Sequence, residues 1–416
     1  MEKIMKIKGA ILVGSALSLA VSSAMGSGFS VSYQSVSALG TAYAGSGVLS
    51  EDASNQWYNP ATLAGLKKAQ VTVTGHQVWI DTDFKADGAS GPGNFKDVEP
   101  FVGSAFLAVP INDTMTFGLA LTAPFGTKIE YQDNWGNALS PVGVPASGDF
   151  YAQESDVQTV NINPSLGIQV TDRLNLGVGV SYQRIDADLK NAATRLEGDD
   201  DAVGWNVGLT YQADDNNRFG IAYRSKMEYT VDGDITFHPA ATGAPVDMTF
   251  DGKADIDLPA SLQLSYAGNM TDRTQLLLGV EWMEWSDLNK LEVKHGGPAP
   301  LPNPAVENFD WENTVRYSLG LRHTLTNDTV LRFGVAKEDS TQGTSNRSAM
   351  SPDSDRVWVT LGAGFKPTDN MSIDVGYAHI FVSDADITRQ DGTKPPLSGT
   401  YELDANVVGA QLNYTF

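Results

Sequence analysis

Apolar residues alternate with small or polar ones along most of the chain, starting near residue 69. In the stretch MTFGLALTAPFG, from Met115 to Gly126, every odd position is apolar, and the even positions carry Thr, Gly, Ala and Pro. A two-residue period is the pattern of a strand with one apolar face. The same pattern recurs at 71–84, 101–109, 157–170, 174–182, 203–211, 219–223, 256–266, 276–282, 315–325, 331–335, 357–365, 371–381 and 408–416. It predicts an all-β chain of 14 antiparallel strands.

The connections between these strands fall into two sets that alternate along the chain. The short, polar set is found at 111–114, 171–173, 213–217, 271–273, 326–329 and 366–370. The long, acidic set includes 126–155, 184–202, 232–255, 286–313 and 338–354. Short turns at one end and long loops at the other are typical of outer-membrane barrels. Because lipid offers no water to backbone groups, such strands must close into a ring. We therefore predict a transmembrane β-barrel over residues 69–416.

A water-soluble β-sandwich would also alternate, so the two faces have to be compared. One parity of the predicted strands is apolar, and the other is rich in Gly, Ser, Asn, Gln and Thr. The second set is too small and too polar to make a core, whereas it suits the lumen of a barrel whose apolar face meets lipid. The patterning therefore favours the barrel.

The first residues have the composition of an export signal. Three lysines precede the apolar run GAILVGSALSLAV, and small residues follow up to Gly26. This predicts a signal peptide over 1–26, with Ser27 as the first mature residue. The chain has no cysteine, which fits an exported bacterial protein, and its net charge of −22 argues against nucleic acid as a partner. We expect a monomer in the bacterial cell outer membrane, surrounded by outer-membrane lipid and lipopolysaccharide.

Residues 27–66 do not alternate and form a separate unit before the barrel. They are rich in Gly, Ser and Ala, and Asn59 followed by Pro60 marks the N-cap and first position of a short helix. The side chains of a 14-stranded barrel cannot fill its own lumen. We therefore predict that 27–66 form a small, partly helical N-terminal hatch that plugs the lumen. A periplasmic appendage is the alternative.

Pro124 interrupts the otherwise regular alternation of 115–126. A proline has no N–H to donate to a neighbouring strand, and Gly126 permits a sharp change of direction. In one interpretation, the strand is kinked here and leaves a gap in the barrel wall. In the other, the strand simply ends and loop 126–155 begins. Position in the sequence favours neither.

Several blocks in order along the mature chain carry a family resemblance. They are SGFSVSYQSVSALGTAYAG directly after the signal peptide, Asn59-Pro60-Ala61, NNRFGIAYRSKM at 216–227 and NRSAMSPDSDRVWV at 346–359. Together they resemble the FadL-type family of outer-membrane long-chain fatty acid and hydrophobic compound transporters. The resemblance implies a 14-stranded barrel with a lumenal hatch. It also implies passive, inward transport of long-chain fatty acids or related hydrophobic compounds.

The resemblance also assigns residues to the transport route. A kinked third strand would open a lateral gap toward the bilayer, formed by Ala123, Pro124, Phe125 and Gly126. Phe29 would project from the hatch tip into an apolar lumenal pocket that binds the ligand. The hatch would meet the kinked strand at Asn59, Pro60 and Ala61.

Loop 126–155 is unusually apolar for a surface loop. Its large apolar residues are Trp135, Leu139, Val142 and Val144. They suit the first capture of a hydrophobic ligand, and we count them with Phe29 as candidate ligand-binding residues. A loop that packs on itself explains them equally well.

The sequence shows no clear motif for metal binding or catalysis. The five histidines show no paired metal spacing, and LEGDDDA at 196–202 lacks the ligand spacing of a calcium loop. We expect no catalytic residue, no metal and no cofactor. A general diffusion porin for small hydrophilic solutes and a structural or adhesive barrel remain as alternative functions. The choice between a fatty acid and a neutral or aromatic hydrocarbon stays open.

Overall fold

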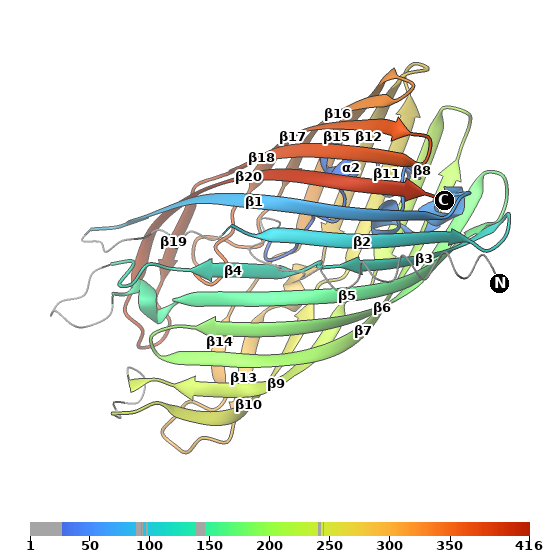
Figure 1. The fold of residues 1–416 in the computed structure, drawn as a ribbon. Coiled ribbons are helices and arrows are strands. Elements are labelled where there is room, and N and C mark those ends of the chain that lie inside the picture. The colour runs from blue at the N-terminus through green and yellow to red at the C-terminus, as the bar shows by residue number, and fades with distance from the viewer. Residues whose placement is uncertain are drawn as a thin grey trace.

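The computed structural model describes residues 27–88, 93, 95–96, 99–137, 146–239, 243 and 245–416. The predicted signal peptide lies outside these residues. Within them, nearly all regular structure belongs to one antiparallel sheet that closes on itself (Figure 1). Its first ten strands are β1 (Gln70–Ala86), β2 (Phe101–Pro110), β3 (Met115–Thr122), β4 (Gly126–Glu130), β5 (Glu154–Gln169), β6 (Leu174–Lys190), β7 (Thr194–Gln212), β8 (Asn217–Arg224), β9 (Met227–Phe237) and β10 (Met248–Leu258).

The second half of the chain completes the sheet. Its strands are β11 (Ser261–Asn269), β12 (Thr274–Met283), β13 (Lys290–His295), β14 (Ala305–Asn308), β15 (Thr314–Thr326), β16 (Thr329–Glu338), β17 (Arg356–Thr368), β18 (Met371–Val382), β19 (Ala385–Arg389) and β20 (Leu397–Thr415). The short helices are α2 (Val36–Leu39), α3 (Asn55–Tyr58), η3 (Pro60–Gly65), η4 (Gly148–Phe150) and η5 (Trp285–Asp287). Among the described residues, no helix is both long and apolar enough to cross a membrane.

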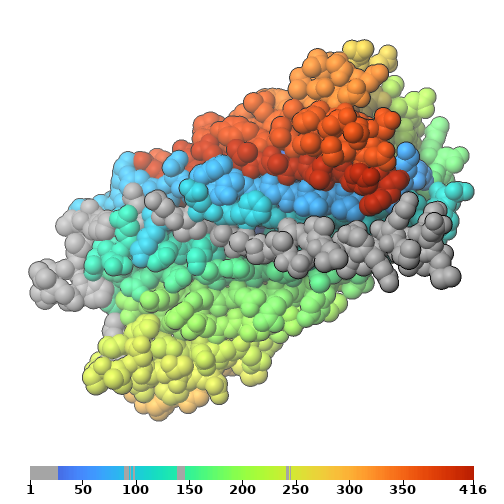
Figure 2. Space-filling model, in the orientation of Figure 1, coloured from blue at the N-terminus to red at the C-terminus, as the bar shows by residue number. Residues whose placement is uncertain are grey.

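Several of these strands lie end to end, so that the ring has 14 wall positions. For example, β3 and β4 both pair with β5, and β18 and β19 both pair with β20. The ring closes where β1 pairs with β20, from Gln70 opposite Thr415 to Ala86 opposite Gly399. Figure 2 shows this seam as the red C-terminal strands beside the blue first strand. The predicted 14-stranded antiparallel barrel is confirmed.

The two faces of the wall follow the predicted alternation. On β3, Phe117 is exposed on the outside, whereas Gly118 and Ala120 are buried on the inside. The short connections are stabilised by side chains that accept backbone N–H bonds. Asn112 Oδ1, for instance, accepts from Met115 N at 2.9 Å. Such turns tighten the reversals at this end, which is the periplasmic end in barrels of this kind.

Residues 36–65 lie inside the ring, where their backbone touches glycines of the wall. A Cβ added to Gly177 of β6 would lie 2.1 Å from Ala61 N, and one added to Gly334 of β16 would lie 2.2 Å from Thr41 C. The predicted short helix is present as η3, and the Asn59 side chain accepts from Ala61 N at 2.9 Å. The glycine-rich lumenal parity therefore serves close backbone packing.

Buried charges also tie this segment to the wall. Glu51 forms ion pairs with Arg322 and, at 3.5 Å, with Arg332. Arg332 in turn pairs with Asp374 of β18 at 2.8 Å. Because burial of an unpaired charge is costly, displacing the segment would require these groups to find new partners.

Candidate functional site

The wall is interrupted where the sequence placed Pro124. β3 ends at Thr122 and β4 resumes at Gly126 on the same partner, β5. The interpretation in which the strand ends and loop 126–155 begins is therefore wrong, because the wall continues to Glu130. On the other side, β2 pairs with β3 only as far as Ala105 opposite Leu121. Among the described residues, no wall strand pairs with β4 on its other edge, and only Phe95 and Lys96 bridge its far end at Glu130 and Tyr131. The ladder between β2 and β4 is therefore open at residues 123–126.

The N-terminal segment occupies this open edge. Val31 N donates to Pro124 O at 2.8 Å, and Gly126 N donates to Phe29 O at 2.9 Å, which forms a short antiparallel bridge. Gln34 adds a side-chain link: its Nε2 donates to Ala123 O at 2.9 Å. Its Oε1 accepts from Ser104 Oγ of β2 at 2.6 Å. Residues 29–34 thus substitute for the missing strand contact.

The interruption also reverses which residues face inward. Phe125 belongs to the parity that faces lipid on β3, but here its ring is buried inside the barrel. Its centroid lies 6.2 Å from that of Phe29 and 6.0 Å from that of Trp285. Phe29 in turn lies 5.1 Å from Trp285 and 5.8 Å from Trp311. Phe125 thus does not follow the lipid-facing parity of β3, because residues 123–125 leave strand geometry and break the alternation.

The aromatic group around Phe29 is one end of a longer apolar surface. A single contiguous cluster joins Phe29 and Phe125 to Leu189, Leu196 and Leu291 farther toward the long-loop end. These three leucines line an apolar groove between β6, β7, β9, β10 and β13. A contiguous cluster of apolar side chains therefore connects the outer groove to the interruption in the wall.

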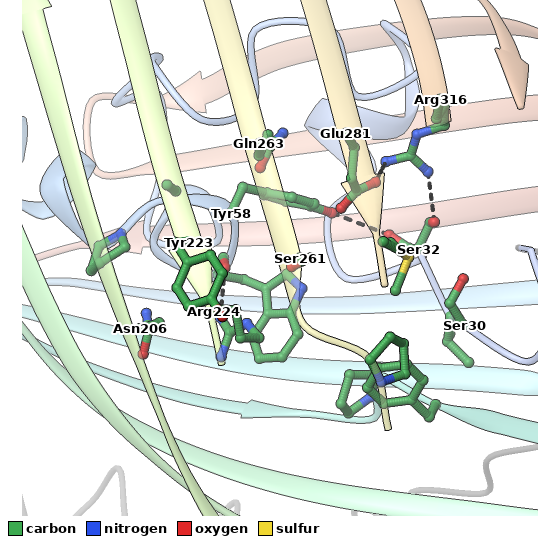
Figure 3. A pocket seen from close by; sticks show the side chains of 18 residues that line it. Ser30, Ser32, Tyr58, Asn206, Tyr223, Arg224, Ser261, Gln263, Glu281 and Arg316 are labelled. Atoms are coloured by element: carbon green, nitrogen blue, oxygen red, sulfur yellow. Dashed lines mark hydrogen bonds and ion pairs between the residues drawn. The ribbon is translucent and has the colours of Figure 1, made fainter. Parts of the chain in front are cut away.

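A cavity of about 70 Å³ lies beside Phe125 and Pro124, between the N-terminal segment and the wall (Figure 3). Such a space holds only a few water molecules. Arg316 reaches it, paired with Glu281 at 2.5 Å and donating to Ser32 Oγ at 2.7 Å.

Arg224, at the end of β8, is the second cation on the cavity wall. Its Nη2 donates to Trp57 O at 2.8 Å, its Nη1 donates to Ser181 Oγ at 3.1 Å, and its guanidinium lies 3.7 Å from the centroid of the Trp57 ring. Within the described part of the chain, no carboxylate forms an ion pair with it. Sequence reasoning missed this residue, although an arginine on the lumenal parity of 216–227, two residues after Ala222, was a visible signal.

The predicted capture residues fall in two groups. Trp135 is fully buried, stacks on Tyr131 at 3.8 Å and donates from Nε1 to Ala152 O at 2.6 Å. Trp135 is thus packed between its own loop and the rings of Phe84 and Tyr401 in β1 and β20. Leu139, Val142 and Val144 lie outside the described residues.

The contacts that the structure gives for Asn59 and Ala61 are with wall strands β7 and β6 rather than with the kinked strand. Asn59 Nδ2 donates to Leu209 O of β7 at 3.1 Å, and Ala61 packs against Gly177 of β6. Pro60 lines the cavity that also reaches Pro124. The contact of η3 with β3 is made by Leu63, at Gly118. Helix η3 runs across four wall strands, β3, β5, β6 and β7, and its first residues lie against β6 and β7.

Comparisons with known proteins agree with this architecture. The profile of the family described as outer membrane protein transport protein (OMPP1/FadL/TodX) matches residues 17–416. Outer membrane protein P1 of Haemophilus influenzae is 28% identical over 97% of this chain and 98% of its own. The long-chain fatty acid transport protein of Escherichia coli O6:H1 is 26% identical over 100% of both chains.

Solved structures share the fold. A FadL homologue of Pseudomonas aeruginosa superimposes with a TM-score of 0.83 over 94% of this chain and 100% of its own, at 22% identity. The toluene transporter TbuX of Ralstonia pickettii gives 0.66 over 90% and 98%, at 16% identity. Since the profile match spans both the lumenal segment and every strand of the wall, this chain belongs to the OMPP1/FadL/TodX family of outer membrane transport proteins.

Proposed function

We propose that this protein is a passive outer-membrane transporter of long-chain fatty acids, which it releases sideways into the bilayer. The observation that carries the proposal is the contiguous apolar cluster from Leu196 in the outer groove to Phe125 at the interruption of the wall. Each methylene that leaves water for such a surface gains about 0.8 kcal/mol, so an acyl chain binds along it without an energy source. Such a path needs no catalytic group.

Capture is assigned to the groove rather than to the loop around Trp135. Leu189, Leu196 and Leu291 line the groove near the long-loop end, whereas Trp135 is fully buried. A hydrophobic ligand arriving from outside therefore meets the groove first.

Residues 27–66 act as the plug and the gate of this path. The cavity beyond Phe29 holds only a few waters, so a long acyl chain enters only if the tip around Phe29 moves. The same tip donates and accepts the hydrogen bonds that occupy the edge at Pro124. Displacing it would enlarge the pocket and free the lateral exit in one step. A porin for hydrophilic solutes would instead need an open lumen, which the docking of this segment on the wall argues against.

Arg224 favours a carboxylate over a neutral hydrocarbon. It is a cavity-lining cation whose described partners are a carbonyl, a hydroxyl and an aromatic ring. Charge-assisted hydrogen bonds to a carboxylate are about twice as strong as neutral ones. Proteins similar to this chain include ones named for long-chain fatty acids and, among solved structures of the same fold, ones named as toluene transporters, so the two ligand classes have to be tested directly.

The test of the exit is uptake of a labelled long-chain fatty acid by Gram-negative cells that lack their own transporter. The variant Pro124→Val with Gly126→Ala restores a regular strand and should abolish uptake. The matched control is Pro164→Val, which changes a proline within the regular β3–β5 ladder. With equal barrel levels, uptake by the double variant at the wild-type rate would refute lateral exit.

The test of the ligand class uses Arg224→Gln in the same cells. Fatty acid uptake should fall at low concentration, and uptake of an alkane or toluene should not change. Equal loss for all three ligands would point to a structural role of Arg224. No loss for any would remove it from the binding site.

A further inference from the structure

Ser27, the residue that follows the predicted signal peptide, is buried deep in the barrel. Only 1% of it is exposed, and its hydroxyl lies 3.0 Å from Thr314 Oγ1 of β15. Its backbone nitrogen donates to Glu338 Oε1 at 3.2 Å. The next nitrogen, that of Gly28, donates to Asp353 Oδ2 at 3.2 Å. The start of the mature chain therefore points its nitrogens at carboxylates.

Glu338 is a buried carboxylate whose hydrogen bonds come from neutral donors. It is 2% exposed, and besides the Ser27 nitrogen it accepts from Trp358 Nε1 at 3.0 Å. Arg316 and Arg356 lie opposite it on the two neighbouring strands. They form ion pairs elsewhere, Arg316 with Glu281 and Arg356 with Asp353. Over the residues that the structure describes, no lysine or arginine side chain pairs with Glu338.

Two further arginines nearby do not fill this role. Arg347 donates from Nε to the main-chain carbonyl of Asp353, and Arg224 donates to Trp57 and Ser181 across the cavity. Burying a carboxylate without a cation is strongly unfavourable, and two neutral donors compensate it only in part. Among the described residues, Glu338 therefore has two arginines opposite it but no cation at ion-pair distance, because both arginines pair with other carboxylates.

We propose that cleavage between Gly26 and Ser27 supplies a cation at that distance: the new α-ammonium group of Ser27, whose nitrogen lies 3.2 Å from Glu338 Oε1, forms a buried ion pair with Glu338. Hydrolysis of the Gly26–Ser27 peptide bond by water leaves a carboxylate on the released signal peptide and an amine on Ser27. Such an amine is mostly protonated at neutral pH. The pair anchors the tip that carries Phe29, two residues along the chain, so that removal of the signal peptide completes the closed state of the barrel. The inference does not depend on which molecule the protein carries.

The first experiment is chemical labelling of the purified full-length mature protein. Intact-mass analysis should give Ser27 as the first residue. An amine-acylating reagent used near neutral pH, where lysines are protonated, should modify the Ser27 amine at least about tenfold more slowly in the folded than in the denatured protein, because a buried group reacts only through local opening. A mature chain that starts elsewhere, or equal rates in the two states, would overturn the proposal.

Two variants separate an ion pair from simple burial. Glu338→Gln keeps the shape and the Trp358 contact but removes the charge, and it should speed labelling by about tenfold because an unpaired buried ammonium is expelled. Glu402→Gln, which alters an exposed pair with Lys85, is the matched control and should leave the rate unchanged. Protection in Glu338→Gln equal to the wild type would mean that the amine is buried without the ion pair and would reject the proposal.

If Glu338→Gln fails to fold, a second change tests the same point. A Gly-Ser dipeptide inserted between Gly26 and Ser27 moves the amine two residues away from Glu338 and leaves the barrel sequence intact. Its amine should label at the rate of the denatured protein. Continued protection of the displaced amine would contradict a specific site at Ser27.

Discussion

Replacing Gly177 by alanine tests whether the lumenal segment closes the barrel. Gly177 faces inward on β6, and an added Cβ would lie 2.1 Å from Ala61 N and 2.2 Å from Pro60 C. Real Cβ contacts essentially never fall below 3.0 Å, so the first residues of η3 would have to retreat by about 0.9 Å. Both atoms belong to the backbone, and no side-chain rotation relieves the clash.

The cost of this retreat can be worked from the contacts that hold η3. Overpacking of a tight interior costs about 1–3 kcal/mol. The displacement also strains the bonds from Asn59 Nδ2 to Gly47 O at 2.7 Å and to Leu209 O at 3.1 Å. Each buried group left unsatisfied adds about 1–3 kcal/mol. A total near 3 kcal/mol would raise the population of the displaced segment by about two orders of magnitude.

The assay is the conductance of the purified barrel in planar bilayers, together with sugar permeation in liposomes. Gly279→Ala is the matched control, because the same substitution on the same lumenal face brings Cβ to 3.4 Å from Ala44 Cα, an ordinary contact. Gly177→Ala should leak ions and sugars, and Gly279→Ala should behave as the wild type. Equal conductance of the two variants, both folded, would refute the idea that this docking seals the lumen.

Three further outcomes follow from the same geometry. Gln34→Leu removes the side-chain link between β2 and the interruption and leaves its buried partners unsatisfied, so amide exchange in residues 29–34 should accelerate in mass-spectrometric measurements. Burial alone would raise the pKa of Glu51, but Arg332 and Arg322 hold that pKa below its ordinary value of 4.5. Its contribution to docking is therefore complete above pH 4.5 and lost as the pH falls below it, so conductance should rise only on strong acidification. Leu196→Asn in the outer groove should raise the ligand concentration needed for half-maximal uptake with little change in the maximal rate, and an unchanged concentration dependence would remove the groove from the route.

Much of the barrel could be predicted from the sequence, because it depends on local chemistry. A strand between lipid and lumen must alternate whatever its neighbours are, so the segments from 71–84 to 408–416 were visible without any contact information. The turn at Asn112 and the cap at Asn59 were likewise predictable, since both depend on side chains that bond to backbone a few residues away.

The transport path is formed by groups distant in sequence, and the hydrophobic alternation did not predict which of them meet. Phe125 kept its apolar parity in the sequence, but the interruption at residues 123–125 turned it toward Phe29, 96 positions earlier in the chain. Trp135 could be identified from the sequence as an apolar loop residue, but only its packing in the structure, for example against Tyr131, showed that it is buried. Arg224 could be read from the sequence, but whether a carboxylate pairs with it depends on which strands surround it.

The sequence by itself determined the alternation, the number of strands and the position of the break in the third, because these follow from the repeat of the backbone and from the missing N–H of Pro124. Only the tertiary structure decided that Val31, Phe29 and Gln34 occupy the broken edge, and that a contiguous apolar cluster connects it to Leu196. Ring closure sets these relations by bringing segments from the whole chain into one lumen. No local pattern encodes which residues then meet.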